Sequence, residues 1–132
     1  MCYKKFDESK EFLEAEQHCV AEGGHLARIS SEGESEMVGA IGGRGVFWIG
    51  LWSGDEHKCY IDKSRFVWTD EAPGTDFDDW PSSQPDCCSP NNGCEGTVSG
   101  AGVIFNHLDR SNGWDDALIE DSFPFVCGMP QE

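Results

Sequence analysis

The chain has 132 residues, a length that suits one domain, and its 25 acidic residues against 9 Lys and Arg give a formal net charge of −16. Proteins that bind nucleic acids or anionic membranes need a basic footprint, so this balance argues against both kinds of partner. Hydrophobic residues make up 38% of the chain and five residues are Trp, which is enough apolar surface to argue against a disordered acidic tail.

Seven cysteines are many for so short a chain, because proteins of the reducing cytosol seldom keep that number of thiols. We therefore expect a secreted protein or the extracellular portion of a membrane protein. No segment approaches the ~20 apolar residues of a membrane span and no signal peptide opens the sequence, so we expect a piece of a longer precursor that does not itself insert into a membrane. Seven is an odd number, which leaves at least one thiol without a partner in this chain, and Cys2 is the first candidate.

A helix is predicted near the start of the chain, between Ser9 as its N-cap and Gly23-Gly24 as its stop. The apolar residues expected on its inner face are Phe12, Ala15, Cys19 and Val20.

A second helix is predicted from the Ser-x-x-Glu capping box at Ser31 and Glu34 to about Gly42-Gly43. Its expected inward residues are Met37, Val38 and Ile41.

Strands are predicted at 46–51, where an apolar run suits burial on both faces, and more weakly at 65–68. Two closing strands are predicted at 103–108 and 123–127, separated by a turn around Asn112-Gly113. Between Trp52 and Ala101 most of the chain has no regular pattern, and four cysteines inside it favour a loop pinned by bonds. Helices early and strands late indicate an α+β fold.

Short motifs occur in a fixed order along nearly the whole chain: Cys2-Tyr3, Glu14-Ala15-Glu16-x-x-Cys19, Gly23-Gly24-His25-Leu26-Ala27, Trp48-Ile49-Gly50-Leu51, Trp68-Thr69-Asp70, Trp80, Gln84-Pro85-Asp86, Trp114-Asp115-Asp116 and Phe125-Val126-Cys127. This series resembles the C-type lectin-like domain. The resemblance implies one domain over residues 1–132, with two helices packed on small antiparallel sheets and a long disulfide-pinned loop. It also implies a disulfide between Cys19 and Cys127, and an upstream hairpin partner for Cys2.

The inner disulfide of that family is expected near Gly102 and Ile119, and neither residue is Cys, so we expect the whole bridge to be replaced. Four other cysteines, which allow three pairings, are Cys59, Cys87, Cys88 and Cys94. A bond between the neighbouring Cys87 and Cys88 is strained. We therefore favour one bond from Cys59 to either of them and one from Cys94 to the other. A zinc site built from these thiols and His57 is the alternative.

The resemblance further implies a calcium site in which Gln84-Pro85-Asp86 and the family's Trp-Asn-Asp motif supply oxygen ligands. In this chain the implied metal ligands are Gln84, Asp86, Glu95, Asp115 and Asp116, with Asn92 as the alternative to Glu95. Gln84, Asp86, Asp115 and Asp116 are also implied as the carbohydrate-binding residues, together with Trp80. The order Gln-Pro-Asp is similar to that of galactose-type members, so the expected ligands are glycans ending in galactose or N-acetylgalactosamine.

Two departures from the family pattern bear on this hypothesis. Asp115 stands where the family has Asn, which removes one amide donor, and residues 87–104 contain no aromatic ring that could stack on a sugar. A protein-binding domain that uses the cysteine-rich loop 87–95, with calcium structural or absent, is therefore the main alternative, and ice binding is a third. A second calcium ion at Asp76, Asp78 and Asp79 is a further possibility. No nucleophile elbow or metalloprotease motif occurs, so we expect no enzyme.

Overall fold

A computed structural model describes residues 2–55, 66–70, 77, 80, 100–106 and 113–130. Within these ranges the chain forms two helices and seven strands, so the α+β prediction is confirmed. The helices are α1 (Phe12–Ala21) and α2 (Glu32–Gly42). The strands are β1 (Cys2–Lys10), β2 (His25–Leu26), β3 (Val46–Trp52), β4 (Val67–Trp68), β5 (Ala101–Asn106), β6 (Gly113–Leu118) and β7 (Phe123–Met129).

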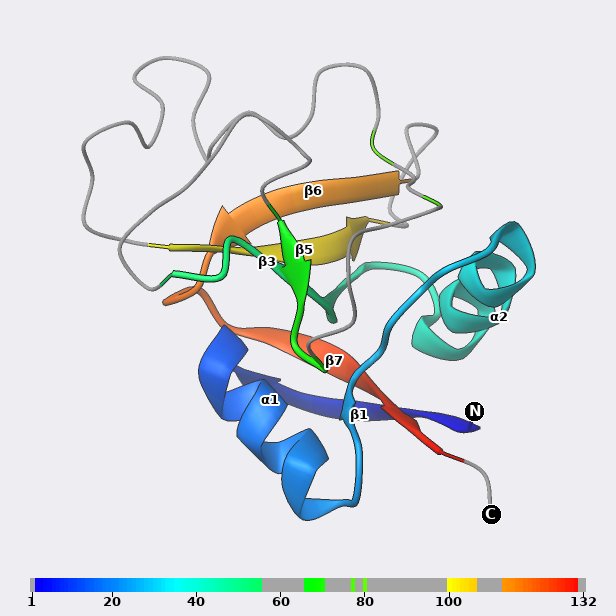
Figure 1. Ribbon diagram of the computed structural model, residues 1–132, viewed down its shortest axis with the longest axis horizontal. Coiled ribbons are helices and arrows are strands. Elements are labelled where there is room, and N and C mark those ends of the chain that lie inside the picture. Colours follow the sequence, from blue (N-terminus) through cyan, green and yellow to red (C-terminus); the bar gives the residue numbers. More distant parts are fainter. Residues whose placement is uncertain are drawn as a thin grey trace.

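The strands form one sheet in the order β1-β7-β3-β5-β6, with β2 beside β7 and β4 beside β3. All described pairs are antiparallel except β3 with β7, which meet in parallel at Trp48 and Phe125. Figure 1 shows β6 and β1 at opposite ends of this sheet, with α1 beside β1 and β7. Cys2 pairs with Met129, so the two ends of the described chain lie side by side.

The hydrophobic core lies on both faces of β3, as the predicted buried strand requires. Phe47, Ile49 and Leu51 belong to one buried cluster, whereas Trp48 between them belongs to a second cluster with Phe12. Successive side chains of a strand point to opposite faces, so β3 supplies both clusters at once. The Trp48 indole N–H is satisfied by the Lys10 carbonyl at 2.8 Å.

The predicted start of α1 at Ser9 is wrong. Strand β1 continues through Lys10, which pairs with Phe123, so the chain is still extended at Ser9. Glu11 is the N-cap instead, and it exchanges side-chain and backbone contacts with Glu14 in a capping box. Phe12, Ala15 and Cys19 are buried as predicted, but Val20 is 53% exposed and lies outside the inner face.

The start of α2 is confirmed, because the Glu34 N–H donates to the Ser31 hydroxyl at 3.1 Å. Val38 is buried as predicted, but the inward prediction for Met37 is wrong, since its side chain is 51% exposed. A Cβ on Gly42 would lie 2.2 Å from the Phe47 ring, so the helix approaches the sheet through this glycine. This close approach turns the side of the helix that carries Val38 and Gly42 toward the sheet. Neighbouring side chains of a helix are about 100° apart around its axis, so Met37, next to Val38, points away from the sheet.

Strand β6 lies between the two predicted closing strands, where the sequence indicated a turn alone. β5 covers 101–106 and β7 covers 123–129, close to the predicted ranges, but Gly113 begins a strand that pairs with β5 from Gly113–Asn106 to Leu118–Ala101. Residues 107–112 lie outside the described ranges. The weak prediction near 65–68 corresponds to β4, which pairs Val67 and Trp68 with β3.

The disulfide between Cys19 and Cys127 is confirmed and ties α1 to β7, with 5.4 Å between the Cα atoms and a sequence separation of 108. Both half-cystines are fully buried. The predicted pairings of Cys59, Cys87, Cys88 and Cys94, and their zinc alternative with His57, fall outside the described residues.

Aromatic packing occupies the region where the family's inner bridge was expected. A Cβ on Gly102 would lie 2.5 Å from the Phe12 ring and 2.7 Å from the Trp48 ring, which leaves no room for a cysteine side chain. Ile119 is buried, and its N–H donates to the Gly100 carbonyl at 3.2 Å. Ring packing and a backbone hydrogen bond therefore join these segments in place of a disulfide.

Candidate functional site

Strand β6 carries the Trp114-Asp115-Asp116 motif. Trp114 lies opposite Phe105, Asp115 opposite Ile104 and Asp116 opposite Val103. Because side chains alternate along a strand, Asp116 shares its face with Trp114 and Asp115 faces the other side. β6 is the last strand in the described sheet order. Side chains from both of its faces could therefore reach a ligand that lies at its outer edge.

Tryptophan rings surround the start of this motif. Trp114 is fully buried and meets Trp68, Trp80 and Phe77 edge to face, at ring-centroid distances of 5.8, 5.8 and 6.1 Å. Trp80 also packs against Phe66, at 5.3 Å. The structure therefore brings Trp80 to the base of β6, beside the residue that precedes both aspartates, although the two tryptophans are far apart in the sequence.

The Trp114 indole N–H is a buried donor with no hydrogen-bond partner among the described residues. Unsatisfied buried polar groups are rare because each costs roughly 1–3 kcal/mol. The Trp114 ring is therefore held by packing alone in the described part of the chain.

The aspartates of β6 have the chemistry of hard-cation ligands. Asp116 is only 5% exposed. Calcium prefers such carboxylate oxygens, so Asp115 and Asp116 fit the predicted ion in kind. No group of three His, Cys, Asp or Glu side chains converges within the described residues. Gln84, Asp86, Glu95 and the second-site aspartates Asp76, Asp78 and Asp79 lie outside them.

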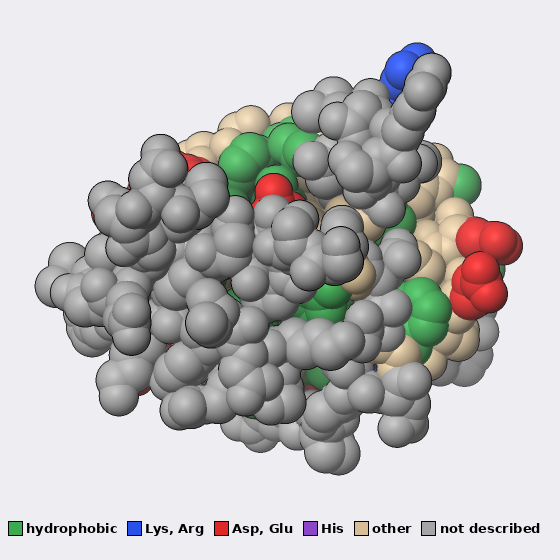
Figure 2. Space-filling view, turned by 90° about the horizontal axis from the view of Figure 1, so that it is seen from above, with side chains coloured by type: hydrophobic (Ala, Val, Ile, Leu, Met, Phe, Trp, Pro, Cys, Tyr) green, Lys and Arg blue, Asp and Glu red, His purple; other side chains and the backbone are tan. Residues whose placement is uncertain are grey.

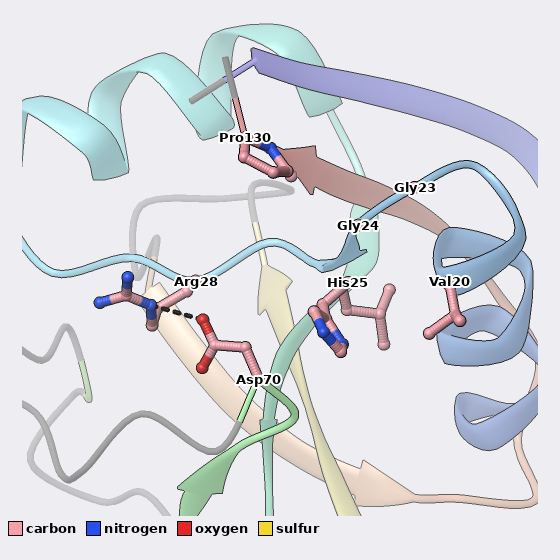
Figure 3. A pocket seen from close by; sticks show the side chains of 9 residues that line it. Val20, Gly23, Gly24, His25, Arg28, Asp70 and Pro130 are labelled. Atoms are coloured by element: carbon pink, nitrogen blue, oxygen red, sulfur yellow. Dashed lines mark hydrogen bonds and ion pairs between the residues drawn. The ribbon is translucent and has the colours of Figure 1, made fainter. Parts of the chain in front are cut away.

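A separate hollow of about 490 Å³, which the sequence analysis missed, opens between β2, the end of β7 and the turn after β4. It is lined by Val20, Gly23, Gly24, His25, Leu26, Arg28, Asp70, Gly128 and Pro130. Figure 3 shows Asp70 between Arg28 and His25, with Pro130 across the hollow. None of the predicted ligands is among these lining residues.

The polar side chains of this hollow already have partners. Arg28 Nε donates to Asp70 Oδ2 at 2.7 Å, and His25 Nδ1 lies 2.5 Å from Glu16 Oε2. The sequence did signal these residues, since His25 and Asp70 belong to the quoted motifs, but it did not show that the motifs meet. The Arg28–Asp70 ion pair joins residues that are 42 positions apart in the chain, so we interpret this hollow as structural.

A polar network connects β1 to α2. The Tyr3 hydroxyl has two acceptors within reach of its single proton, Glu34 Oε2 at 3.3 Å and the Arg28 carbonyl at 3.4 Å. Partial burial, followed by the negative charge of Glu34, raises the pKa of Tyr3 to about 12. Burial alone would raise the pKa of Glu34, but hydrogen bonds from Ser30 and Tyr3 and the charge of Arg28 together lower it.

Surface charge favours cations over anions. On the face shown in Figure 2, acidic side chains of the described residues appear at several places and a basic one appears at one margin. The whole chain has a formal net charge of −16. Such a field attracts divalent cations and repels polyanions. No helix in the described part of the chain is both long enough and apolar enough to span a membrane.

Comparison with known proteins places these features in context. The protein-family model "Lectin C-type domain" matches residues 8–129. C-type lectin BpLec of Bothrops pauloensis is 34% identical over 134 aligned residues, covering 96% of this chain and 88% of the relative. The alpha-N-acetylgalactosamine-specific lectin of Patiria pectinifera is 32% identical, covering 97% and 73%. The structure of herring type II antifreeze protein has a TM-score of 0.77 at 22% identity, covering 99% of this chain and 91% of that one.

Proposed function

Since this chain belongs to the C-type lectin family and has its fold, we propose that it is an extracellular, calcium-dependent carbohydrate-binding domain of the galactose type. The observation that carries the proposal is the position of Asp115 and Asp116 on β6, the last strand in the described sheet order, next to the tryptophans at its base. Asp115 and Asp116 carry carboxylate oxygens of the kind that calcium prefers, and they would approach a shared ion from the two faces of β6. We propose no catalytic activity for the chain.

Each proposed ligand has a distinct part in this function. Asp115 and Asp116 contribute carboxylate oxygens, and Gln84, Asp86 and Glu95 are proposed to complete the ligand set. Calcium, when bound, offers coordination positions to two neighbouring hydroxyls of a sugar. A sugar hydroxyl also needs an amide to donate to it and a carboxylate to accept from it. Gln84 before Asp86 sets that amide-acid order, and we propose that it selects galactose.

One relative supports the proposed sugar specificity, whereas one residue of the motif argues for weak binding. The Patiria pectinifera relative is named as specific for alpha-N-acetylgalactosamine, in agreement with the Gln-Pro-Asp order. Asp115 in place of Asn removes an amide donor from β6. We therefore expect Gln84 to be the amide donor at this site and the affinity for a single sugar to be weak.

Retention on immobilised sugars tests the proposal. The chain should be retained on galactose resin in millimolar calcium, less on mannose resin, and should elute with a chelator. Asp116→Asn should abolish retention, because it removes a carboxylate that is buried on the edge strand. Asp121→Asn is the matched control, since this exposed aspartate lies in the turn after β6 and should leave retention unchanged. Absence of calcium-dependent retention on both resins would refute the carbohydrate proposal.

Protein binding is the second candidate function. The cysteine-rich segment 87–95 and the absence of an aromatic residue from 87 to 104 favour it over sugar stacking. Substitution of residues 89–93 should then abolish capture of a protein partner, whereas Asp86→Ala should not. Loss of capture in Asp86→Ala would refute this candidate.

Ice binding, the third candidate, has only the fold in common with the herring antifreeze structure. A measurement of thermal hysteresis tests it directly. A freezing gap no larger than that of a lectin control would exclude it.

A further inference from the structure

The pairing between β3 and β5 is irregular near the end of β3 and the start of β5. The regular register ends at Ile49 and Val103, and the next pair is Trp52 with Gly102. This irregularity has the form of a β-bulge, in which one strand carries extra residues and the ladder is locally disrupted. Bulges are common beside functional sites because they redirect a strand. Here the bulge begins at Val103, the residue that lies opposite Asp116.

The extra residues of β3 bond to other segments. The Gly50 N–H donates to the Ala27 carbonyl at 2.8 Å, and the Gly50 carbonyl accepts from the Thr69 N–H, also at 2.8 Å. Leu51 lies opposite Trp68 of β4. At the bulge, β3 is therefore held by segments other than β5, and it must meet β5 again beyond the bulge to close this part of the sheet.

Ser53 makes the closing contact, with Ala101. The Ser53 N–H donates to the Ala101 carbonyl at 2.8 Å. In a regular hydrogen-bonded antiparallel pair, the return bond runs from the second residue's N–H to the first residue's carbonyl. Here the Ala101 N–H donates to the Ser53 hydroxyl instead, at 3.2 Å. The hydroxyl in turn donates to the Asp55 carbonyl at 2.9 Å, so it both accepts and donates a hydrogen bond.

The surroundings of this contact make the hydroxyl hard to replace. Ser53 is 4% exposed and Ala101 is fully buried, and a buried N–H that loses its acceptor is costly because water does not readily take the acceptor's place. From the other side, the Ile119 N–H donates to the Gly100 carbonyl at 3.2 Å. Residues 100 and 101 are thus bonded to the end of β3 on one side and to the residue after β6 on the other.

This closure stands beside both parts of the proposed calcium site. Ser53 and Ala101 flank the segment 54–100, which contains every proposed calcium ligand outside β6. Ala101 also lies two residues before Val103, on the same face of the sheet as Asp116. The hydrogen bonds between Ser53 and Ala101 therefore hold the residues that flank the segment and the start of the strand that pairs with the aspartates.

From these contacts we propose that Ser53 is a positioning residue of the calcium site, an inference that rests on the proposed carbohydrate-binding function. Its hydroxyl holds the two flanks of the segment 54–100 together at the bulge. Ligands that are held in place before an ion arrives bind it more tightly, because less conformational entropy is lost on binding. Loss of the hydroxyl should therefore weaken calcium binding in a chain that stays folded.

The variants Ser53→Thr and Ser53→Val test the hydroxyl directly, because their side chains have nearly the same shape and only threonine has the hydroxyl. Amide hydrogen exchange, measured by NMR without calcium, should show the Ala101 N–H exchanging on the order of tenfold faster in the valine variant. The amides of β1 and β7 should exchange alike in both variants. Equal exchange at Ala101 would overturn the closing role of the hydroxyl.

Calorimetric titration with calcium chloride tests the effect on the site. Ser53→Ala should raise the dissociation constant on the order of tenfold, and Ser53→Thr should bind calcium more tightly than Ser53→Val. Ser35→Ala is the matched control, because Ser35 is also a buried serine, at 6% exposure, but lies in α2 against β1 and β7. It should change the dissociation constant by less than about twofold. Circular dichroism should show all four variants folded.

Two contrary results have different meanings. If the unmodified chain binds no calcium, the proposed function is refuted and the positioning role of Ser53 with it. If the unmodified chain binds calcium and Ser53→Ala binds it equally well, only the positioning role is refuted. Equal affinities of the threonine and valine variants, or an equal loss in Ser35→Ala, would also refute the positioning role alone.

Discussion

Removal of the Cys19–Cys127 disulfide should cause a large loss of stability. The bridge spans a sequence separation of 108. In the chain-entropy model, a closed loop of that size restricts the unfolded chain by about 16 cal/mol/K, or about 4.8 kcal/mol at 25 °C. The unfolding entropy of a chain of 132 residues is roughly 280 cal/mol/K near its midpoint. The double substitution Cys19→Ala and Cys127→Ala should therefore lower the melting temperature by roughly 17 °C.

Substitution is preferable to reduction, because a reductant would act on every disulfide of the chain. Urea unfolding followed by tryptophan fluorescence gives the free energy of unfolding, and thermal unfolding followed by near-ultraviolet circular dichroism gives the midpoint. Cys2→Ala, in the exposed start of β1, is the control and should change the free energy by less than about 0.5 kcal/mol. A loss below about 1 kcal/mol in the double variant would refute the loop-closure reasoning.

Three further predictions concern packing, helix propensity and pH. Gly102→Ala should destabilise the fold by about 2 kcal/mol in urea unfolding, because its Cβ would lie 2.5 Å from the Phe12 ring. Gly33→Ala should instead stabilise it by about 0.5–1 kcal/mol, since the nearest atom to a Cβ there is 4.0 Å away on an exposed part of α2. The pKa of Tyr3 is raised from 10.0 to about 12, so the stability it contributes is complete below pH 10 and is lost as the pH rises toward 12. Tyr3→Phe should remove about 1 kcal/mol of this alkaline dependence in unfolding curves measured between pH 9 and pH 12, a value reduced for partial exposure.

Each of these predictions has a clear contrary result. Equal effects of Gly102→Ala and Gly33→Ala would mean that the ring contacts at β5 tolerate a methyl group. An unchanged alkaline slope in Tyr3→Phe would mean that the hydroxyl titrates alike in the folded and unfolded chains.

Elements with a strong local signal were predictable from the sequence. The apolar run of β3 indicated burial on both faces, and the capping residue Ser31 indicated the start of α2. The Cys19–Cys127 pairing came from the family resemblance, because no local pattern specifies which distant cysteines meet. In each case, either one short segment or one known motif order contained the necessary information.

Elements held by pairing alone were not predictable. β1 and β6 contain charged residues where alternation of apolar and polar side chains would mark a strand, as Lys4-Lys5 and Asp115-Asp116 show. Their backbones are fixed by β7 and β5, far away in the sequence. The exposure of Met37 has a similar origin, because the contact between Gly42 and the Phe47 ring sets the rotation of α2 and Phe47 lies outside the helix, in β3.

The sequence predicted which residues form the candidate site, but it did not predict how they are arranged in space. The motif gave Asp115 and Asp116, but only the sheet shows that they lie on the last strand in the described order and face opposite sides. The meeting of Trp80 with Trp114 likewise depends on how the chain returns to the sheet. The ligand roles of Gln84, Asp86 and Glu95 remain predictions from the motif.

The contacts among Trp68, Trp80 and Trp114 give the protein an optical signal at its proposed site. Their rings meet nearly at right angles, at 90° and 80°, with Trp114 common to both contacts. Neighbouring indoles exchange excitation energy and emit according to the polarity around them. An ion or sugar that reorganises the edge of β6 should therefore shift the emission of the unlabelled chain, so a titration in a fluorimeter can follow occupancy without a dye.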